Sequence, residues 1–256
     1  MPAEALTIPI AQPTLIGFIY TLSRVGSAFS LVPMPGFRAG SAAPRVVLIL
    51  AITLALAPRW PTGARELSFW WLAGEVAFGA TVGATMAWLV EAFTMGMQLL
   101  GLQAGYSYAS TIDPSTQADS AVLQLMAQLG AGLLLFEVGL DREIVRVFAA
   151  SLDRFPPGEW KLTEAIASNW IRWTASMITL SLRLALPVVA WLLMLDLVLA
   201  LFGRLQAQLQ LLSLAFPAKM LSALLLMAGS ISWFPELFSQ AAGSTVTQLW
   251  TLVGGR

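Results

Sequence analysis

Residues 69–100 read FWWLAGEVAFGATVGATMAWLVEAFTMGMQLL, and residues 101–120, which follow directly, read GLQAGYSYASTIDPSTQADS. The first stretch is almost entirely apolar, whereas the second is polar, glycine-containing and free of Lys and Arg. A further apolar stretch begins at Ala121, so the polar segment lies between two segments suited to a bilayer. Irregular backbone is tolerated at membrane depth only where protein or water covers its polar groups. The sequence therefore predicts a membrane protein with a sheltered polar loop.

The composition also indicates a lipid environment. Apolar residues make up 57% of the chain and charged residues 11%, against about 25% charged in an average soluble domain. The 14 basic and 14 acidic residues cancel, so no basic surface is expected for DNA or RNA. The absence of Cys and His excludes disulfides, thiol nucleophiles and the usual haem and zinc sites, so no metal or cofactor is expected. The first residues lack the basic start of a cleavable signal peptide, and we expect the mature protein to begin near Met1.

Six apolar stretches predict an all-α integral membrane protein that forms one unit over residues 1–256. A bilayer core of about 30 Å takes about 20 helical residues. As helices, residues 46–57 would reach only about 18 Å, whereas 69–100 and 166–202 would each reach about 50 Å or more. A bundle of regular spans does not fit these lengths. The six stretches are Thr14 to Val32, Val46 to Ala57, Phe69 to Leu100, Ala121 to Leu140, Ile166 to Phe202, and Leu209 to Phe234.

The short stretch at residues 46–57 has basic residues on both sides. Arg38 and Arg45 precede it, and Arg59 and Arg65 follow it. The positive-inside rule would place both ends on the cytoplasmic side of the membrane. The stretch is then either half of a hairpin packed within an assembly or an ordinary re-entrant segment, and these residues favour neither.

Proline and glycine mark the expected ends and bends. Pro156-Pro157-Gly158 interrupts a charged connection at residues 141–164, which mixes both signs and is expected to be solvated. Pro187 lies inside the fifth stretch and predicts a kink or break there, and Pro217 predicts the same later in the chain. The final segment, residues 236–253, is weakly apolar and is expected at a surface or against a partner.

Seven charged residues lie in apolar runs, where each costs about 2.5 to 3.5 kcal/mol on insertion unless a partner or water satisfies it. Glu75 and Glu91 would point about 160° apart around one helix, so they cannot form a catalytic dyad within it. Arg172 and Arg183 fall within about 20° of each other and predict a polar stripe. The stripe is interpreted as snorkelling or subunit-satisfied side chains, as the lining of a water-filled path, or as part of ion coupling. The seven candidates for buried charge are Arg24, Glu75, Glu91, Arg172, Arg183, Asp196 and Lys219.

A stripe of small residues, Gly79, Gly83 and Ala87, recurs at four-residue spacing. Such a stripe lets a neighbouring helix approach closely. Packing within the chain and a subunit interface are both consistent with it.

The polar loop at residues 101–120 is the strongest functional candidate. Gly101 and Gly105 permit backbone turns that other residues rarely adopt. Asp113-Pro114 favours a turn in which the Asp side chain forms a hydrogen bond with the nearby backbone. Its small, hydrogen-bonding residues and its lack of Lys and Arg favour a plug that yields when something large passes. An ordinary surface loop is the alternative.

Several fragments, in one order over nearly the whole chain, resemble the FliR family of flagellar export-gate proteins, whose injectisome counterparts share the fold. The loop is the specific part, since each flanking fragment alone is weak. Ala104, where a bulkier Met is common in the family, and Asp196, where a neutral polar residue can occur, depart from its pattern. The matching fragments are Gly101-Leu102-Gln103, Asp113-Pro114, Gln117, Arg24-Val25, Pro44-Arg45, Leu184-Ala185-Leu186-Pro187 and Phe216-Pro217-Ala218-Lys219.

The resemblance implies a core subunit of the flagellar type III export gate in the bacterial inner membrane, at the flagellar basal body. It implies kinked helical hairpins, assembly with FliP and FliQ into a cone-like channel for unfolded export substrates, and contact with the export switch protein FlhB. It also implies that residues 101–120 plug the closed pore. The plug residues it identifies are Gly101, Gln103, Gly105, Ser107, Asp113, Pro114 and Gln117.

Three classes of function follow from the sequence. The leading hypothesis is a non-enzymatic, pore-forming subunit for protein export, whose energy comes from elsewhere because no nucleotide-binding P-loop is present. The alternative is a self-contained transporter that uses Asp196, Arg183 or Lys219 for ions or protons, although no inverted repeat supports it. An intramembrane enzyme is the third class, and neither a nucleophile-elbow pattern nor a zinc motif supports it.

Overall fold

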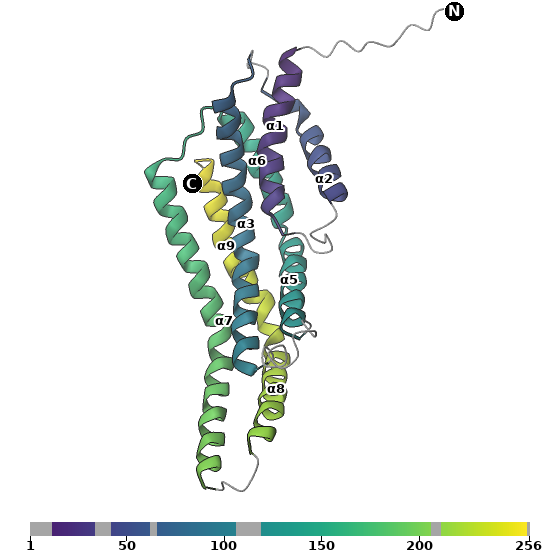
Figure 1. Cartoon of the computed structure of the whole chain (residues 1–256). Helices are drawn as coiled ribbons and strands as arrows, with labels where there is room; N and C mark the ends of the chain where they lie inside the picture. The colour runs from purple at the N-terminus through teal and green to yellow at the C-terminus, as the bar shows by residue number, and fades with distance from the viewer. Residues whose placement is uncertain (1–11, 34–41, 62–65, 106–118, 206–210, 255–256) are drawn as a thin grey trace, which may run out of the picture.

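All regular structure in the described residues is helical. The structure is a computed structural model that describes residues 12–33, 42–61, 66–105, 119–205 and 211–254. The predicted all-α fold is confirmed over this part of the chain (Figure 1). The helices are α1 (Gln12–Leu31), α2 (Ala42–Ala55), α3 (Phe69–Ala104), α5 (Asp119–Glu137), α6 (Leu140–Arg154), α7 (Glu164–Leu205), α8 (Leu211–Ser230) and α9 (Phe234–Leu252), with 3₁₀ turns at Ala57–Arg59 and Ile231–Trp233.

Three of the described helices, α1, α3 and α7, are long and apolar enough to cross a membrane. With 36 residues in α3 and 42 in α7, these two reach about 54 Å and about 63 Å at the usual helical rise. Both exceed a bilayer core of about 30 Å. A fourth candidate is the pair formed by the second part of α8 and α9, which is bent by 64°. The apolar stretches of irregular length in the sequence therefore correspond to helices of irregular length in the structure.

The first two helices form a hairpin, in which α2 runs back alongside α1 (Figure 1). The 14 residues of α2 span about 21 Å, too little to cross a bilayer core. Arg45 at its start donates a hydrogen bond from Nη1 to the carbonyl oxygen of Ser30, 3.2 Å away, near the end of α1. The chain thus contains a helical hairpin at this point, and whether it packs within an assembly or is re-entrant stays a prediction.

Helix α3 lies at the centre of the molecule, between α1 and α7 (Figure 1). A Cβ built on Gly79 would lie 1.9 Å from the carbonyl oxygen of Arg24, and one on Gly83 would lie 2.3 Å from that of Ala28. Only glycine permits this approach of α1. The small-residue stripe thus serves packing within the chain, which decides between the two interpretations of it.

Two segments are more deeply packed than the sequence indicated. The predicted solvated connection at residues 141–164 contains α6, in which Ile144, Val147 and Phe148 are buried while Arg142 and Arg146 are exposed. The final segment forms α9, and Phe238 and Leu249 are fully buried in the main core. The connection that was expected to be solvated therefore buries one face of α6, and the segment expected at a surface or against a partner packs part of α9 into the chain's own core. A helix that is only weakly apolar overall can still bury a narrow apolar face.

Of the kink or break predicted at Pro187, the break is absent, because α7 continues through that residue, and α8 likewise continues through Pro217. The kink stays a prediction. Neighbouring helices and local adjustment allow proline inside apolar helices. Around Pro187 the side chains of Ala185, Val188 and Leu192 are buried against the end of α3 and against α8. These contacts form a second, smaller core at the end of α3.

Candidate functional site

The candidate site is the end of α3, where the chain enters the predicted plug loop. Helix α3 continues to Ala104 and ends at Gly105, which has a left-handed φ of 87°. The Gly105 N–H donates to the carbonyl oxygens of Gly101 and Leu102, which is a common way of ending a helix. Gly101 and Gln103 therefore lie in the last turns of the helix, and the loop begins later than residue 101.

Four of the predicted plug residues, Ser107, Asp113, Pro114 and Gln117, lie outside the described residues. Their role stays a prediction. The structure does show what holds the segment at its first end. That anchor consists of the α3 terminus and the side chains packed against it.

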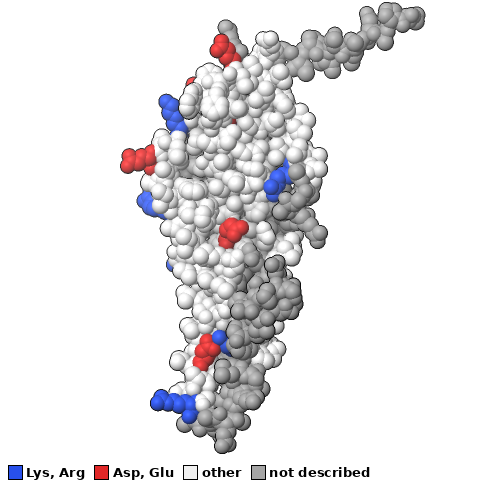
Figure 2. Space-filling model, in the orientation of Figure 1, with Lys and Arg blue, Asp and Glu red and all other residues white. Residues whose placement is uncertain are grey.

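A polar cluster joins the end of α3 to the two helices beside it. Asp196 of α7 accepts a hydrogen bond at Oδ2 from Gln103 Nε2, 3.3 Å away. Lys219 of α8 places Nζ 2.9 Å from both carboxylate oxygens of Asp196. Figure 2 shows an acidic and a basic group side by side near the narrow end of the molecule, within a mostly uncharged surface. Three helices are thus held together through one carboxylate.

The surroundings of this cluster are apolar on one side and open on the other. The side chain of Lys219 is 14% exposed and that of Asp196 is 40% exposed. Leu100, Ala104 and Leu192 form the buried side of the smaller core nearby. An ion pair that is partly covered is screened less than a surface pair. The cluster therefore favours one arrangement of the α3 terminus against α7 and α8.

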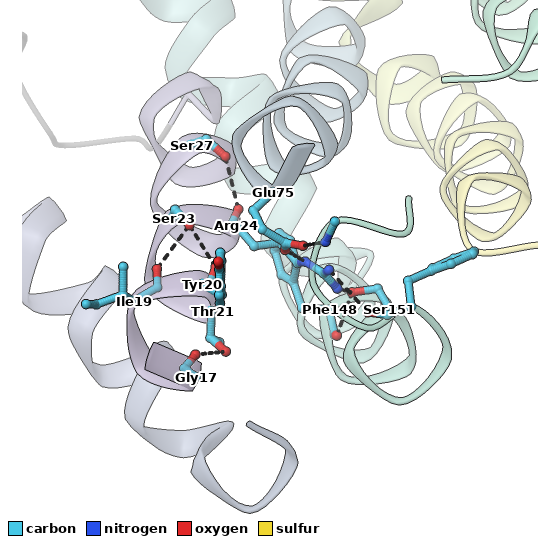
Figure 3. A network of polar contacts seen from close by, with 12 residues as sticks. Gly17, Ile19, Tyr20, Thr21, Ser23, Arg24, Ser27, Glu75, Phe148 and Ser151 are labelled. Carbon is cyan, nitrogen blue, oxygen red and sulfur yellow. Dashed lines mark hydrogen bonds and ion pairs between the residues drawn. The ribbon is translucent and has the colours of Figure 1, made fainter. Parts of the chain in front are cut away.

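A second polar network lies at the other end of the molecule, around two buried charged side chains (Figure 3). The side chains of Arg24 in α1 and Glu75 in α3 are each 1% exposed, and Arg24 Nε donates to Glu75 Oε2. Arg24 also donates from Nη1 to Ser151 Oγ at 2.9 Å and from Nη2 to the carbonyl oxygen of Phe155 at 3.4 Å. The other Glu75 oxygen accepts from the N–H of Gly158 at 3.3 Å. Both buried charges are satisfied, as buried charges must be.

This network ties α1 and α3 to α6 and to the turn that follows it. Gly158 has a φ of 80°, and a Cβ there would lie 2.3 Å from the ring of Trp71. The guanidinium carbon of Arg24 lies 5.0 Å from the centre of the Phe78 ring, at a distance typical of a cation–π contact. Because both charged side chains are buried and bonded to groups of the chain itself, we assign this network a structural role.

The remaining candidates for buried charge lie on the surface of the single chain. Glu91, Arg172 and Arg183 are exposed, so the chain itself does not bury them. Arg172 bonds to Asn169 within α7. Glu75 and Glu91 occupy different environments, one buried and one exposed, and share no contact.

Sequence reasoning named Arg24 and Glu75 but missed their partners. Ser151 is a polar residue at a position of α6 that faces the core, between the buried Phe148 and Leu152. The Ser151 hydroxyl, alone on an apolar face of α6, was the feature of the sequence that could have indicated a partner for a buried charge. The described residues contain no group of three or more acidic side chains that could hold a metal ion.

Comparison with known proteins identifies the family. Residues 15–245 match the model of the family described as bacterial export proteins, family 1. The chain belongs to this family. Among its relatives are three proteins named flagellar biosynthetic protein FliR. That of Escherichia coli K12 is 29% identical over 219 residues, 82% of each chain. That of Caulobacter vibrioides is 26% identical over 217 residues, 82% of this chain and 86% of the relative.

A third family relative, from Buchnera aphidicola of Schizaphis graminum, is 22% identical over 231 residues, 87% of this chain and 90% of the relative. The resemblance read from the sequence fragments is therefore confirmed at the level of the family. The match includes most of α1, all of α2 to α8 and the first part of α9, so both polar networks lie inside it.

Proposed function

We propose that this chain is a component of the flagellar export apparatus and acts there as a non-enzymatic core subunit of the type III protein export gate. It would lie in the bacterial inner membrane and assemble with FliP and FliQ into the secretion channel, in contact with FlhB. The observation that carries the proposal is the family match over residues 15–245. The FliR names of its relatives supply the flagellar context.

The surface of the chain supports a subunit rather than a self-sufficient protein. Only 17% of the most apolar 18-residue stretch of α7 is buried inside the chain. Exposed apolar side chains continue from Ile171 to Phe202, a helical distance of about 46 Å. Because this exceeds a bilayer core of about 30 Å, lipid cannot cover the whole face. Protein neighbours would have to cover part of it.

In this proposal the segment after Gly105 helps to close the resting channel. The Gln103–Asp196–Lys219 cluster supports it by fixing the α3 terminus from which the segment starts. Uncharged hydrogen-bonding side chains in the segment would seal the passage without attracting ions of either sign. Unfolded substrates would pass once the segment is displaced, and energy would come from other parts of the machine.

Two measurements test this proposal. Purification of the tagged chain from its native membrane should recover FliP and FliQ with it, and absence of both would contradict the assignment. Deletion of residues 107–117 should make resting membranes permeable to small ions. If the membranes stay as ion-tight as those of the wild type and export is unchanged, the plug assignment is wrong.

A self-contained transporter remains the second candidate, because the Asp196–Lys219 pair could exchange its partner for a transported ion or proton. Its test is flux in liposomes that contain this chain alone. Ion-coupled uptake by the purified chain, abolished by Asp196→Asn, would favour the transporter over the gate subunit.

A further inference from the structure

A groove of about 330 Å³ runs between α3 and α7. From α3 it is lined by Trp88, Glu91, Met95 and Gln98, which lie on one helical face, and from α7 by Met177 and Ile178. Positions i, i+3, i+7 and i+10 of a helix share a face. We call this feature the α3/α7 groove. It lies apart from the Gln103–Asp196–Lys219 cluster and from the buried Arg24 network.

The one charged side chain lining the groove, Glu91, has no partner among the described residues. Glu91 is exposed and, within the described residues, makes no hydrogen bond or ion pair. The other acidic residue of α3, Glu75, is by contrast enclosed and bonded to Arg24 and Gly158. The two carboxylates of one helix thus differ in exposure and in pairing: Glu75 is buried beside a cation, whereas the described residues supply none for Glu91.

Neither lipid nor water suits the α3/α7 groove. Lipid chains would cover Trp88, Met95 and Ile178 but would leave an ionised carboxylate without a partner. Water would solvate the carboxylate but leave the large apolar side chains exposed. An occupant that is apolar and carries one cation satisfies both.

We propose that the α3/α7 groove binds an apolar helix of a neighbouring gate subunit and that a Lys or Arg of that helix pairs with Glu91. The proposal rests on the proposed function, which supplies the neighbouring subunits. Met95 and Met177 suit such a contact, because unbranched methionine side chains adapt to an irregular partner surface. Gln98, one helical turn from Met95, offers a further donor and acceptor for polar groups of the incoming helix.

Charge reversal tests the ionic contact. The full chain is co-expressed with the other gate subunits, and the partner recovered per mole of chain is measured after detergent extraction. Glu91→Lys should lower recovery at least tenfold, and Glu91→Asp should retain most of it. The matched control is Glu137→Lys, which reverses an exposed carboxylate at the end of α5, outside the groove, and should change recovery less than twofold.

A second measurement does not depend on charge. The chain has no Cys, so Met95→Cys introduces a single thiol in the groove. A membrane-permeant maleimide should label it readily in the isolated chain and at least tenfold more slowly in the assembled complex. Equal labelling rates in both states would overturn the proposal even if the charge variants assemble poorly.

Compensation completes the test. Each Lys and Arg in the membrane helices of the partner subunits is changed to Glu in the Glu91→Lys background. One such change should restore recovery to within twofold of the wild type. Unchanged recovery with Glu91→Lys alone, or restoration by none of the partner changes, would overturn the ionic pairing. If the wild-type chain itself recovered no gate subunit, the proposed function would fail instead, so the two failures are distinguishable.

Discussion

Removal of one partner from the buried Arg24–Glu75 pair should strongly destabilise the fold. Both side chains are 1% exposed, so Glu75→Ala leaves a guanidinium enclosed by α1, α3 and α6 with no counter-charge. Removing one partner of a buried ion pair typically costs about 3 to 5 kcal/mol. Glu75→Ala also frees the N–H of Gly158. We expect the free energy of unfolding to fall by about 3 to 5 kcal/mol.

The pair as a whole should contribute much less than that loss. Replacing both partners with apolar residues of similar volume is often neutral or stabilising. Arg24→Met combined with Glu75→Leu should therefore be less destabilised than either single variant. Some loss will persist, because Arg24 also binds Ser151 Oγ at 2.9 Å. The double-mutant cycle should give a coupling energy of at least about 2 kcal/mol.

The assay is equilibrium unfolding in mixed micelles, in which SDS is titrated into a mild detergent and Trp fluorescence is followed. The chain offers a matched control in Arg59 and Asp153, whose Nη1 and Oδ2 are 2.6 Å apart while the two side chains are 47% and 56% exposed. Exposed pairs are worth about 0 to 1 kcal/mol, so Asp153→Ala should have little effect. Equal losses for Glu75→Ala and Asp153→Ala, or additive effects of Arg24→Met and Glu75→Leu, would refute the reasoning.

Three further predictions use the same titration. Gly79→Ala should lower the free energy of unfolding by about 1 to 3 kcal/mol, because its Cβ would lie 1.9 Å from a backbone oxygen of α1. The control is Gly130→Ala, which should be neutral or stabilising because nothing lies within 4 Å of the added Cβ. Equal effects of the two substitutions would show that α1 and α3 do not approach so closely. Lys219→Met should cost about 1 kcal/mol at most, because the remaining Asp196 is 40% exposed and can reach water; a loss of several kcal/mol would mean that the carboxylate is enclosed. Gly105→Ala should cost about 1 to 2 kcal/mol, because its φ of 87° strains any side chain, and no loss would contradict the left-handed end of α3.

Local patterns were sufficient to predict the class of the fold and the chemistry of its parts. Apolar runs of irregular length predicted an all-α membrane protein, and the brevity of α2 predicted a segment that does not cross on its own. Ordered fragments along the chain indicated the family that the comparisons then confirmed. Patterns failed where a helix was judged by its average polarity, as for α6 and α9, since burial depends on one face and its neighbours. At Pro187 the pattern left a kink and a break open, and the surrounding helices allow α7 to continue without a break.

The candidate site was predicted only as separate residues. Gln103, Asp196 and Lys219 each stood out as polar groups in apolar surroundings, but nothing in their spacing indicated that one carboxylate joins all three. The difference between a paired Glu75 and an unpaired Glu91 was equally hidden, because both are carboxylates in the same apolar helix.

The sequence by itself determined that this chain is helical, lies in a membrane, and carries charges that need partners, because those properties follow from residue type and from repeats within a few turns. Only the tertiary structure decided which charges meet, as Arg24 meets Glu75, and which face outward, as Glu91 does. A side chain's partner across the molecule depends on how helices approach each other. That approach is set jointly by small residues, such as Gly79 and Gly83, and by the helices packed around them.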